Sequence, residues 1–222
     1  MRRAFATALL LCACASTPDA SSPEASPPDA APPLTPPASQ REEQADYATS
    51  LFMDACVGHI AKPGDLARWI EERRLPTVEP DLAAKILTGG PGQVWSAAGP
   101  IGQFFLIVVP INPSLNQCSV WAHRADAERL TGHFERLLQG TARPGLSVTT
   151  VADELIEGPG GAYRQLIYNL VRDGAELGWV FVAVTSASEE AEIQGRLMVA
   201  PGKGRQVLAP GSTGTLRPTE PQ

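Results

Sequence analysis

The sequence predicts an α+β domain, in which a mostly antiparallel sheet carries helices packed on one face. Amphipathic helical periodicity fills most of residues 41–88 and returns over residues 125–139. Apolar runs bounded by glycine and proline lie between and after these helices, and Asp173-Gly174 forms a turn centre between two of them. Strictly alternating strand–helix–strand units do not occur, which argues against a doubly wound parallel sheet.

The chain opens with the pattern of an export signal. Arg2 and Arg3 precede a short apolar run over residues 4–11, and small residues close the segment. Crossing ~30 Å of hydrocarbon takes roughly 20 apolar residues in a helix, so this run is too short for a stable anchor. We therefore expect the segment to be cleaved.

The residues Leu11-Cys12-Ala13-Cys14 resemble the lipobox of bacterial lipoproteins. In that family a Leu and a small residue precede the Cys that is acylated and becomes the first residue. The resemblance implies a signal peptide over residues 1–13 and lipidation, including palmitate, at Cys14. Cys12 departs from the family pattern, which usually has Ala, Ser or Thr at that position.

The residue after the lipidated Cys is Ala15, and in Gram-negative lipoproteins a residue other than Asp there implies delivery to the outer membrane, facing the periplasm. The export segment is similar to that of uncharacterised proteobacterial envelope lipoproteins. The alternative is cleavage at the A-x-A pattern of residues 13–15, which releases a soluble periplasmic or secreted protein beginning at Ser16.

Composition restricts the partners of the mature chain. Without residues 1–13, 16 basic side chains face 24 acidic ones, a net charge of about −8. Nucleic acid is not an expected partner, because phosphate binding needs a clustered basic surface. No basic amphipathic helix or second long apolar run is present, so the lipid is the expected membrane contact.

Segments without a core flank the predicted domain. Residues 14–40 carry eight prolines and one large apolar residue, Leu34, and we expect a disordered tether that reaches ~75 Å when extended. Residues 201–222 are rich in glycine, proline, serine and threonine and are expected to be a disordered tail. The globular domain is expected over residues 41–200.

Three helices are expected before the first strand. Over residues 41–60, paired apolar positions recur every four residues, and acidic residues in the first turns favour the helix dipole. Helices over residues 63–75 and 80–88 begin at prolines and end before a proline and a glycine pair, respectively. The second helix is expected to bury Leu66, Trp69 and Ile70.

A fourth helix is expected over residues 125–139, with Gly140 just past its end. Its apolar stripe consists of Leu130, Phe134, Leu137 and Leu138. The expected strands are residues 94–97, 104–109, 118–122, 146–157, 163–171, 177–185 and 193–200. The hairpin around Asp173-Gly174 is the strongest of these pairings.

Cys56 and Cys118 are the cysteines of the domain, and we expect them to form a disulfide in the oxidising envelope. Closing the loop between them contributes on the order of 4 kcal/mol in the chain-entropy treatment. Two buried free thiols are the alternative. Alternation in residues 118–122 places Cys118, Val120 and Ala122 on one face of the strand, and if Cys118 bonds to Cys56, that face packs on the first helix.

The sequence points to no catalytic residue, metal site or cofactor. His59, His123 and His133 lack the short spacings of zinc ligands. We interpret them as residues at the boundary between the core and the surface. No nucleophile elbow occurs, and the glycine runs at 89–92 and 158–161 do not open helices after strands. Cys56 and His59 adjoin on one helical turn as a nucleophile and a base, but the disulfide competes for the same thiol.

Three aromatic residues are the remaining candidates for a site. Trp95, Trp121 and Tyr163 are hypothesised to lie on a sheet face without helices and to bind a partner. Ordinary core positions are the alternative.

The predicted function is that of a non-enzymatic, lipid-anchored module that binds another envelope protein, such as an inhibitor or an immunity protein. Two other classes remain open. One is a periplasmic enzyme that uses a histidine as its acid-base group. The other is a ligand carrier with an enclosed apolar cavity beside the sheet.

Overall fold

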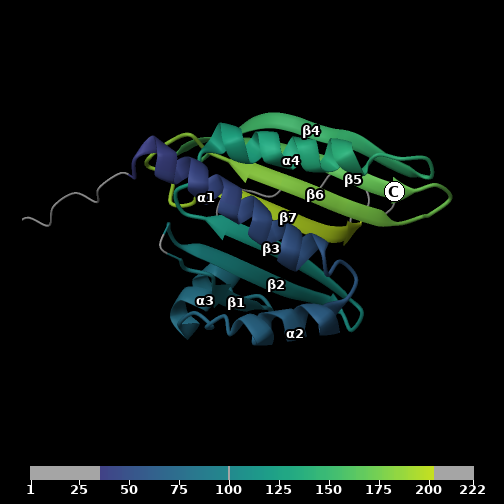
Figure 1. Ribbon diagram of the computed structural model, residues 1–222, viewed down its shortest axis with the longest axis horizontal. Helices are drawn as coiled ribbons and strands as arrows, with labels where there is room; N and C mark the ends of the chain where they lie inside the picture. Colours follow the sequence, from purple (N-terminus) through teal and green to yellow (C-terminus); the bar gives the residue numbers. More distant parts are fainter. Residues whose placement is uncertain (1–35, 100, 203–222) are drawn as a thin grey trace, which may run out of the picture. The chain divides into compact units, whose positions relative to one another are not determined.

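An antiparallel sheet organises the computed structural model, which describes residues 36–99 and 101–202 (Figure 1). Within these residues the sheet has seven strands in the order β1-β2-β3-β7-β6-β5-β4. The α+β class and the antiparallel sheet are therefore confirmed. The expected signal peptide, the lipidation at Cys14 and almost all of the tether and tail lie outside the described residues.

The strands form two meanders that meet in the middle of the sheet. The first meander contains β1 (Gln93–Ser96), β2 (Phe104–Asn112) and β3 (Leu115–Ala122). The second contains β4 (Leu146–Gly158), β5 (Gly161–Arg172), β6 (Gly178–Thr185) and β7 (Gly195–Gly202). β3 and β7 join the two halves, with Val120 opposite Leu197. The hairpin expected around Asp173-Gly174 is confirmed, because β5 pairs with β6 across that turn.

The helices divide between the two faces of the sheet. Their bounds are Ala38–Leu51 for α1, Phe52–Val57 for the π-helix η1, Pro63–Arg73 for α2, Pro80–Leu87 for α3 and Ala127–Thr141 for α4. Residues of α1, η1, α2 and α4 share one core with the sheet, and we call this side the helical face. α3 packs on the opposite face, against β1 and β2, so the helices do not all lie on one face as predicted.

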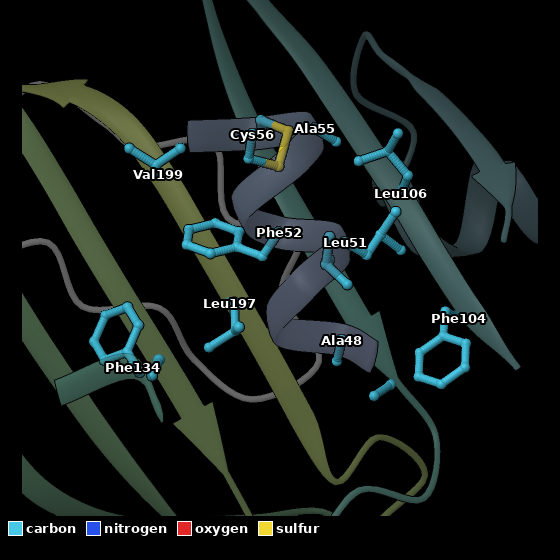
Figure 2. Packing of buried hydrophobic residues seen from close by; sticks show 14 of the residues in the cluster. Ala48, Leu51, Phe52, Ala55, Cys56, Phe104, Leu106, Phe134, Leu197 and Val199 are labelled. Carbon is cyan, nitrogen blue, oxygen red and sulfur yellow. A yellow bond between two sulfur atoms is a disulfide. The ribbon is translucent and has the colours of Figure 1, made fainter. Parts of the chain in front are cut away.

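Alternation along β2 shows the two faces directly. Phe104 and Leu106 belong to the core of the helical face, whereas Phe105 and Ile107 pack with α3. Figure 2 shows Leu51 and Phe52 pointing from the helix toward the strands. Packing against the helices on the two faces removes these apolar side chains of β2 from water, and such burial is the main favourable contribution to folding.

The first helix differs from the uniform α-helix predicted for residues 41–60. α1 begins earlier, at Ala38 after Pro37, and passes into the π-helix η1 at Phe52. A π-helical turn holds more residues than an α-helical turn and rotates the following side chains. Phe52, Ala55 and Cys56 of η1 are all buried.

The disulfide between Cys56 and Cys118 is present, with 5.4 Å between the Cα atoms. It joins η1 to β3 across 62 residues of sequence (Figure 2). Cys118, Val120 and Ala122 face the helices, as the alternation predicted, and Trp121 faces the other way. Because the Cys56 sulfur is bonded to Cys118, it cannot act as a free nucleophile beside His59.

The predicted bounds of β2 and α4 are wrong for physical reasons. β2 continues through Pro110 to Asn112. β1 begins at Gln93, opposite Val108, so the part of β2 beyond Val108 lies at the edge of the sheet. Proline is tolerated there because its missing N–H costs no hydrogen bond to a neighbouring strand. α4 starts later than predicted because Asp126 caps it, accepting a hydrogen bond from the Arg129 N–H at 2.7 Å. The helix then continues through Gly140 to Thr141.

Candidate functional site

Among the described residues, the helical face carries two wide grooves beside the sheet, and a third hollow beside the disulfide, next to His59, holds only about 10 Å³. The first, here called the α2 groove, lies between α2 and strands β1 and β2 and has a volume of about 520 Å³. It is lined by Pro63, Leu66, Ala67, Ile70, Glu71, Gly92, Gln93, Trp95, Val108, Pro110 and Asn116.

The α2 groove has an apolar floor and a polar rim. Leu66 and Ile70 are buried, and Trp95 is half-buried, so its ring is still accessible from the groove. Glu71 and Gln93 are exposed at its border. Carboxylate and amide groups above an apolar floor allow the groove to bind a ligand that has both apolar and hydrogen-bonding groups.

The position of Trp95 is fixed by the chain that precedes α3. Thr77 forms a bridge with Trp95, the Val78 N–H donates to the Val94 carbonyl, and the Ser96 N–H donates to the Pro76 carbonyl. These bonds also cover the outer edge of β1. Gly92 also lines the groove, and its φ of 148° favours glycine because a Cβ there would lie 2.8 Å from Leu87 Cδ2 and 3.0 Å from the Val108 carbonyl oxygen.

The second groove, here called the α4 groove, has a volume of about 410 Å³. It lies between the C-terminal end of α4, the end of η1 and the β5–β6 hairpin. Its lining consists of Val57, Ile60, Leu137, Leu138, Thr141, Leu146, Leu170, Arg172, Ala175, Leu177, Gly178, Trp179 and Phe181. Neither groove is the enclosed cavity expected of the ligand carrier, because both open to solvent.

The three aromatic residues proposed from the sequence do not form one patch. Trp95 lines the α2 groove on the helical face, whereas Trp121 and Tyr163 are buried and face the other way. The Arg196 guanidinium lies 5.0 Å from the centre of the Trp121 ring. The Tyr163 hydroxyl donates a hydrogen bond to the Pro159 carbonyl at 2.6 Å. Of the three, only Trp95 contributes to a groove.

The histidines occupy three separate environments. His59 packs against Trp69 with ring centres 6.2 Å apart, and His123 packs edge-on against Phe105. Burial lowers the pKa of His123 below its usual value, and the neighbouring Arg124 acts in the same direction. Neither residue lines the α2 groove or the α4 groove.

His133 belongs to a polar cluster between α1 and α4. Asp46 accepts hydrogen bonds from Arg129 and from His133 Nε2, each at 2.6 Å. Arg136 donates to His133 Nδ1, and an arginine can only donate, so the imidazole proton resides on Nε2. Both ring nitrogens are therefore engaged. The cluster joins two helices and leaves His133 without a nitrogen for general-base chemistry.

The structure brings no metal-binding set together. Within residues 36–99 and 101–202, no three histidine, cysteine, aspartate or glutamate side chains gather as metal ligands. In the same residues, no helix is both long and apolar enough to cross a membrane.

Sequence reasoning found Trp95 but missed the rest of both grooves. The predicted hairpin is present, and its register puts Leu170 of β5 opposite Trp179 of β6. The approach of α4 and η1 to that hairpin depends on packing between segments far apart in the sequence. No local pattern reports it.

The described domain is thus an antiparallel α+β domain with a structural disulfide and two grooves of different polarity. No protein-family model matches the chain, and no curated protein or solved structure shows significant similarity to it. Its function is therefore inferred from the residues that line the grooves.

Proposed function

We propose that the chain is a lipid-anchored protein of the bacterial outer membrane, facing the periplasm, whose domain binds a segment of another envelope protein in the α2 groove. The observation that carries this proposal is the half-buried Trp95 at the floor of a groove with a polar rim. The anchor is inferred from the lipobox around Cys14, and the Cys56–Cys118 disulfide is compatible with an oxidising compartment.

The chemistry of the groove favours a protein partner. Protein interfaces combine an apolar centre with a polar rim, and tryptophan is among the residues that contribute most to binding. Leu66, Ile70 and Trp95 supply the centre, while Gln93 and Asn116 offer amide groups to a bound backbone. Glu71 on the rim and the acidic composition favour a partner segment with a basic residue.

The proposal is tested by photo-cross-linking in intact cells. A photoreactive residue replaces the exposed Gln93 on the groove rim, and the matched control places it at the exposed Gln139 on α4, outside both grooves. We expect one protein to be captured from position 93 and not from position 139. Mass spectrometry of that product identifies the partner and shows whether it is a toxin, a lysozyme or a resident envelope protein.

Two further variants separate the groove from the anchor. Ala67→Arg places a charged side chain in the α2 groove, and Ala84→Arg makes the same change at an exposed position of α3 outside it. We expect Ala67→Arg to abolish the capture, Ala84→Arg to preserve it and Cys14→Ser to reduce it by removing the lipid. Capture that is equal from positions 93 and 139, or unaffected by Ala67→Arg, contradicts the proposal.

A further inference from the structure

We propose that the α4 groove binds a free long-chain carboxylate, with its acyl chain along the groove and its carboxylate at Arg172. This inference is independent of the partner proposed for the α2 groove, because it rests on a different set of residues. It follows from the polarity of the lining, the position of its one charge and the exposed leucine at its border.

The lining of the α4 groove is almost entirely apolar. Its polar side chains are Thr141 and Arg172, and the Thr141 hydroxyl already donates to the Leu138 carbonyl at 2.7 Å. A bound peptide would lose water from its amide groups and find few side-chain partners there, which is unfavourable. An acyl chain has no such groups to satisfy. The groove volume of about 410 Å³ lies within the usual range for small-molecule sites.

The surface beside the groove is also apolar. Leu177 follows the β5–β6 turn and is 69% exposed, although it is a large aliphatic residue. Trp179, two residues further on, is half-buried and lines the groove with it. An acyl chain lying against Leu177 and Trp179 would remove this surface from water, which favours binding.

Arg172 gives the groove its charge preference. Its position opposite Leu146 puts it on the same face as Leu170, at the end of β5. Asp173 and Glu176 belong to the same turn but do not line the groove. The carbonyl end of α4 carries a partial negative charge of about half an elementary charge, which the full charge of Arg172 exceeds. A carboxylate is therefore favoured at the Arg172 end.

The inference is tested by NMR titration of the full chain with laurate, dodecanol and dodecylamine at concentrations below micelle formation. We expect laurate to shift the methyl signals of Leu137, Leu146 and Leu177, dodecanol to do so more weakly and dodecylamine least. Across decanoate, laurate and myristate, each added methylene should tighten the dissociation constant about fourfold until the groove is filled.

Variants at exposed positions separate the head group from the chain. Arg172→Gln should weaken laurate binding about threefold to fivefold and leave dodecanol unchanged. Leu177→Ser should weaken both ligands. Arg68→Gln on α2 and Leu155→Ser on β4 change the same residue types outside the groove and should leave both affinities unaltered.

Several outcomes would overturn the inference. One is the absence of any laurate-induced shift, and another is a set of shifts confined to residues of the α2 groove. Equal dissociation constants for laurate and dodecylamine would show that Arg172 does not select a carboxylate head group. The last titration uses phosphatidylcholine vesicles without free fatty acid. If these vesicles alone shift the methyl signals of the groove, the groove is a membrane-contact surface and the inference is overturned.

Discussion

Asp46 shows how one carboxylate joins two helices of the helical face. It accepts hydrogen bonds from Arg129 and His133 of α4, and the bonds from Arg129 are the main cause that lowers its pKa below the usual value. Its side chain is 43% exposed, so water weakens the interaction. The cluster therefore contributes a modest, pH-dependent part of the free energy of unfolding.

Replacing Asp46→Asn should lower the free energy of unfolding by about 1 kcal/mol at neutral pH. The native pKa is below the unfolded value of 3.8, so the stabilisation is present above pH 3.8 and is lost as the pH falls through the native pKa. Urea unfolding at neutral and acidic pH measures both effects. Asp54→Asn, at a more exposed ion pair, is the control and should change little; a constant loss at every pH would contradict the assignment.

At the residue scale, the sequence predicted which side chains share a face better than it predicted what covers that face. Alternation correctly separated Cys118 from Trp121 on β3. It did not show that α3 packs on the Trp121 side, because the apolar stripe of a helix specifies that it packs but not on which face of a sheet. Of the two interpretations of Trp121, an uncovered sheet face or an ordinary core position, the structure shows the core position.

Among the elements, the contact of α4 with β7 depends on a residue without a side chain. A Cβ at Gly195 would overlap the Cδ2 atom of Leu130, which is fully buried. Gly195→Ala should lower the free energy of unfolding by about 1–3 kcal/mol. Chemical denaturation measures the change, and Gly140→Ala in the last turn of α4, where a Cβ meets nothing, should be neutral or stabilising. A neutral Gly195→Ala would mean that α4 does not approach β7 this closely.

The disulfide is the covalent link between η1 and β3. Removing it with the double variant Cys56→Ala and Cys118→Ala should lower the free energy of unfolding by about 4 kcal/mol, because the unfolded chain regains the freedom of a 62-residue loop. The variant and the wild type are compared by urea unfolding, and both are repeated with reductant. The reductant should destabilise the wild type alone. Equal midpoints for the two proteins would show that the bond contributes no net stability.

The elements themselves were predicted well where local chemistry decides them. Prolines at the starts of α2 and α3 and the Asp173-Gly174 turn identified these features directly. The π-helix η1 was missed because residues 41–60 satisfy a four-residue repeat whether or not one turn is wider. Local periodicity therefore does not distinguish a π-helical turn from an α-helical one.

For the whole molecule, the order of the strands determines which parts open first. β3 and β7 are central and almost fully buried, whereas no residue of β4 is buried. Hydrogen-exchange mass spectrometry should therefore find the slowest amides in β3 and β7 and faster exchange in β4. Equal protection across the sheet would indicate that the domain opens only as a unit. The sequence did not reveal the β3–β7 pairing, because some 70 residues separate these strands and sequence order favours neighbours.

The two outer edges of the sheet are treated differently. At β1, the segment around Thr77 already occupies the hydrogen-bonding groups, while β4 has a pairing partner only on its β5 side within the described residues. Among the described residues, association of copies by strand addition is therefore expected at β4, which is the longer free edge. Two molecules that join through β4 satisfy each other's free β4 edges, so this mode of pairing closes at two copies.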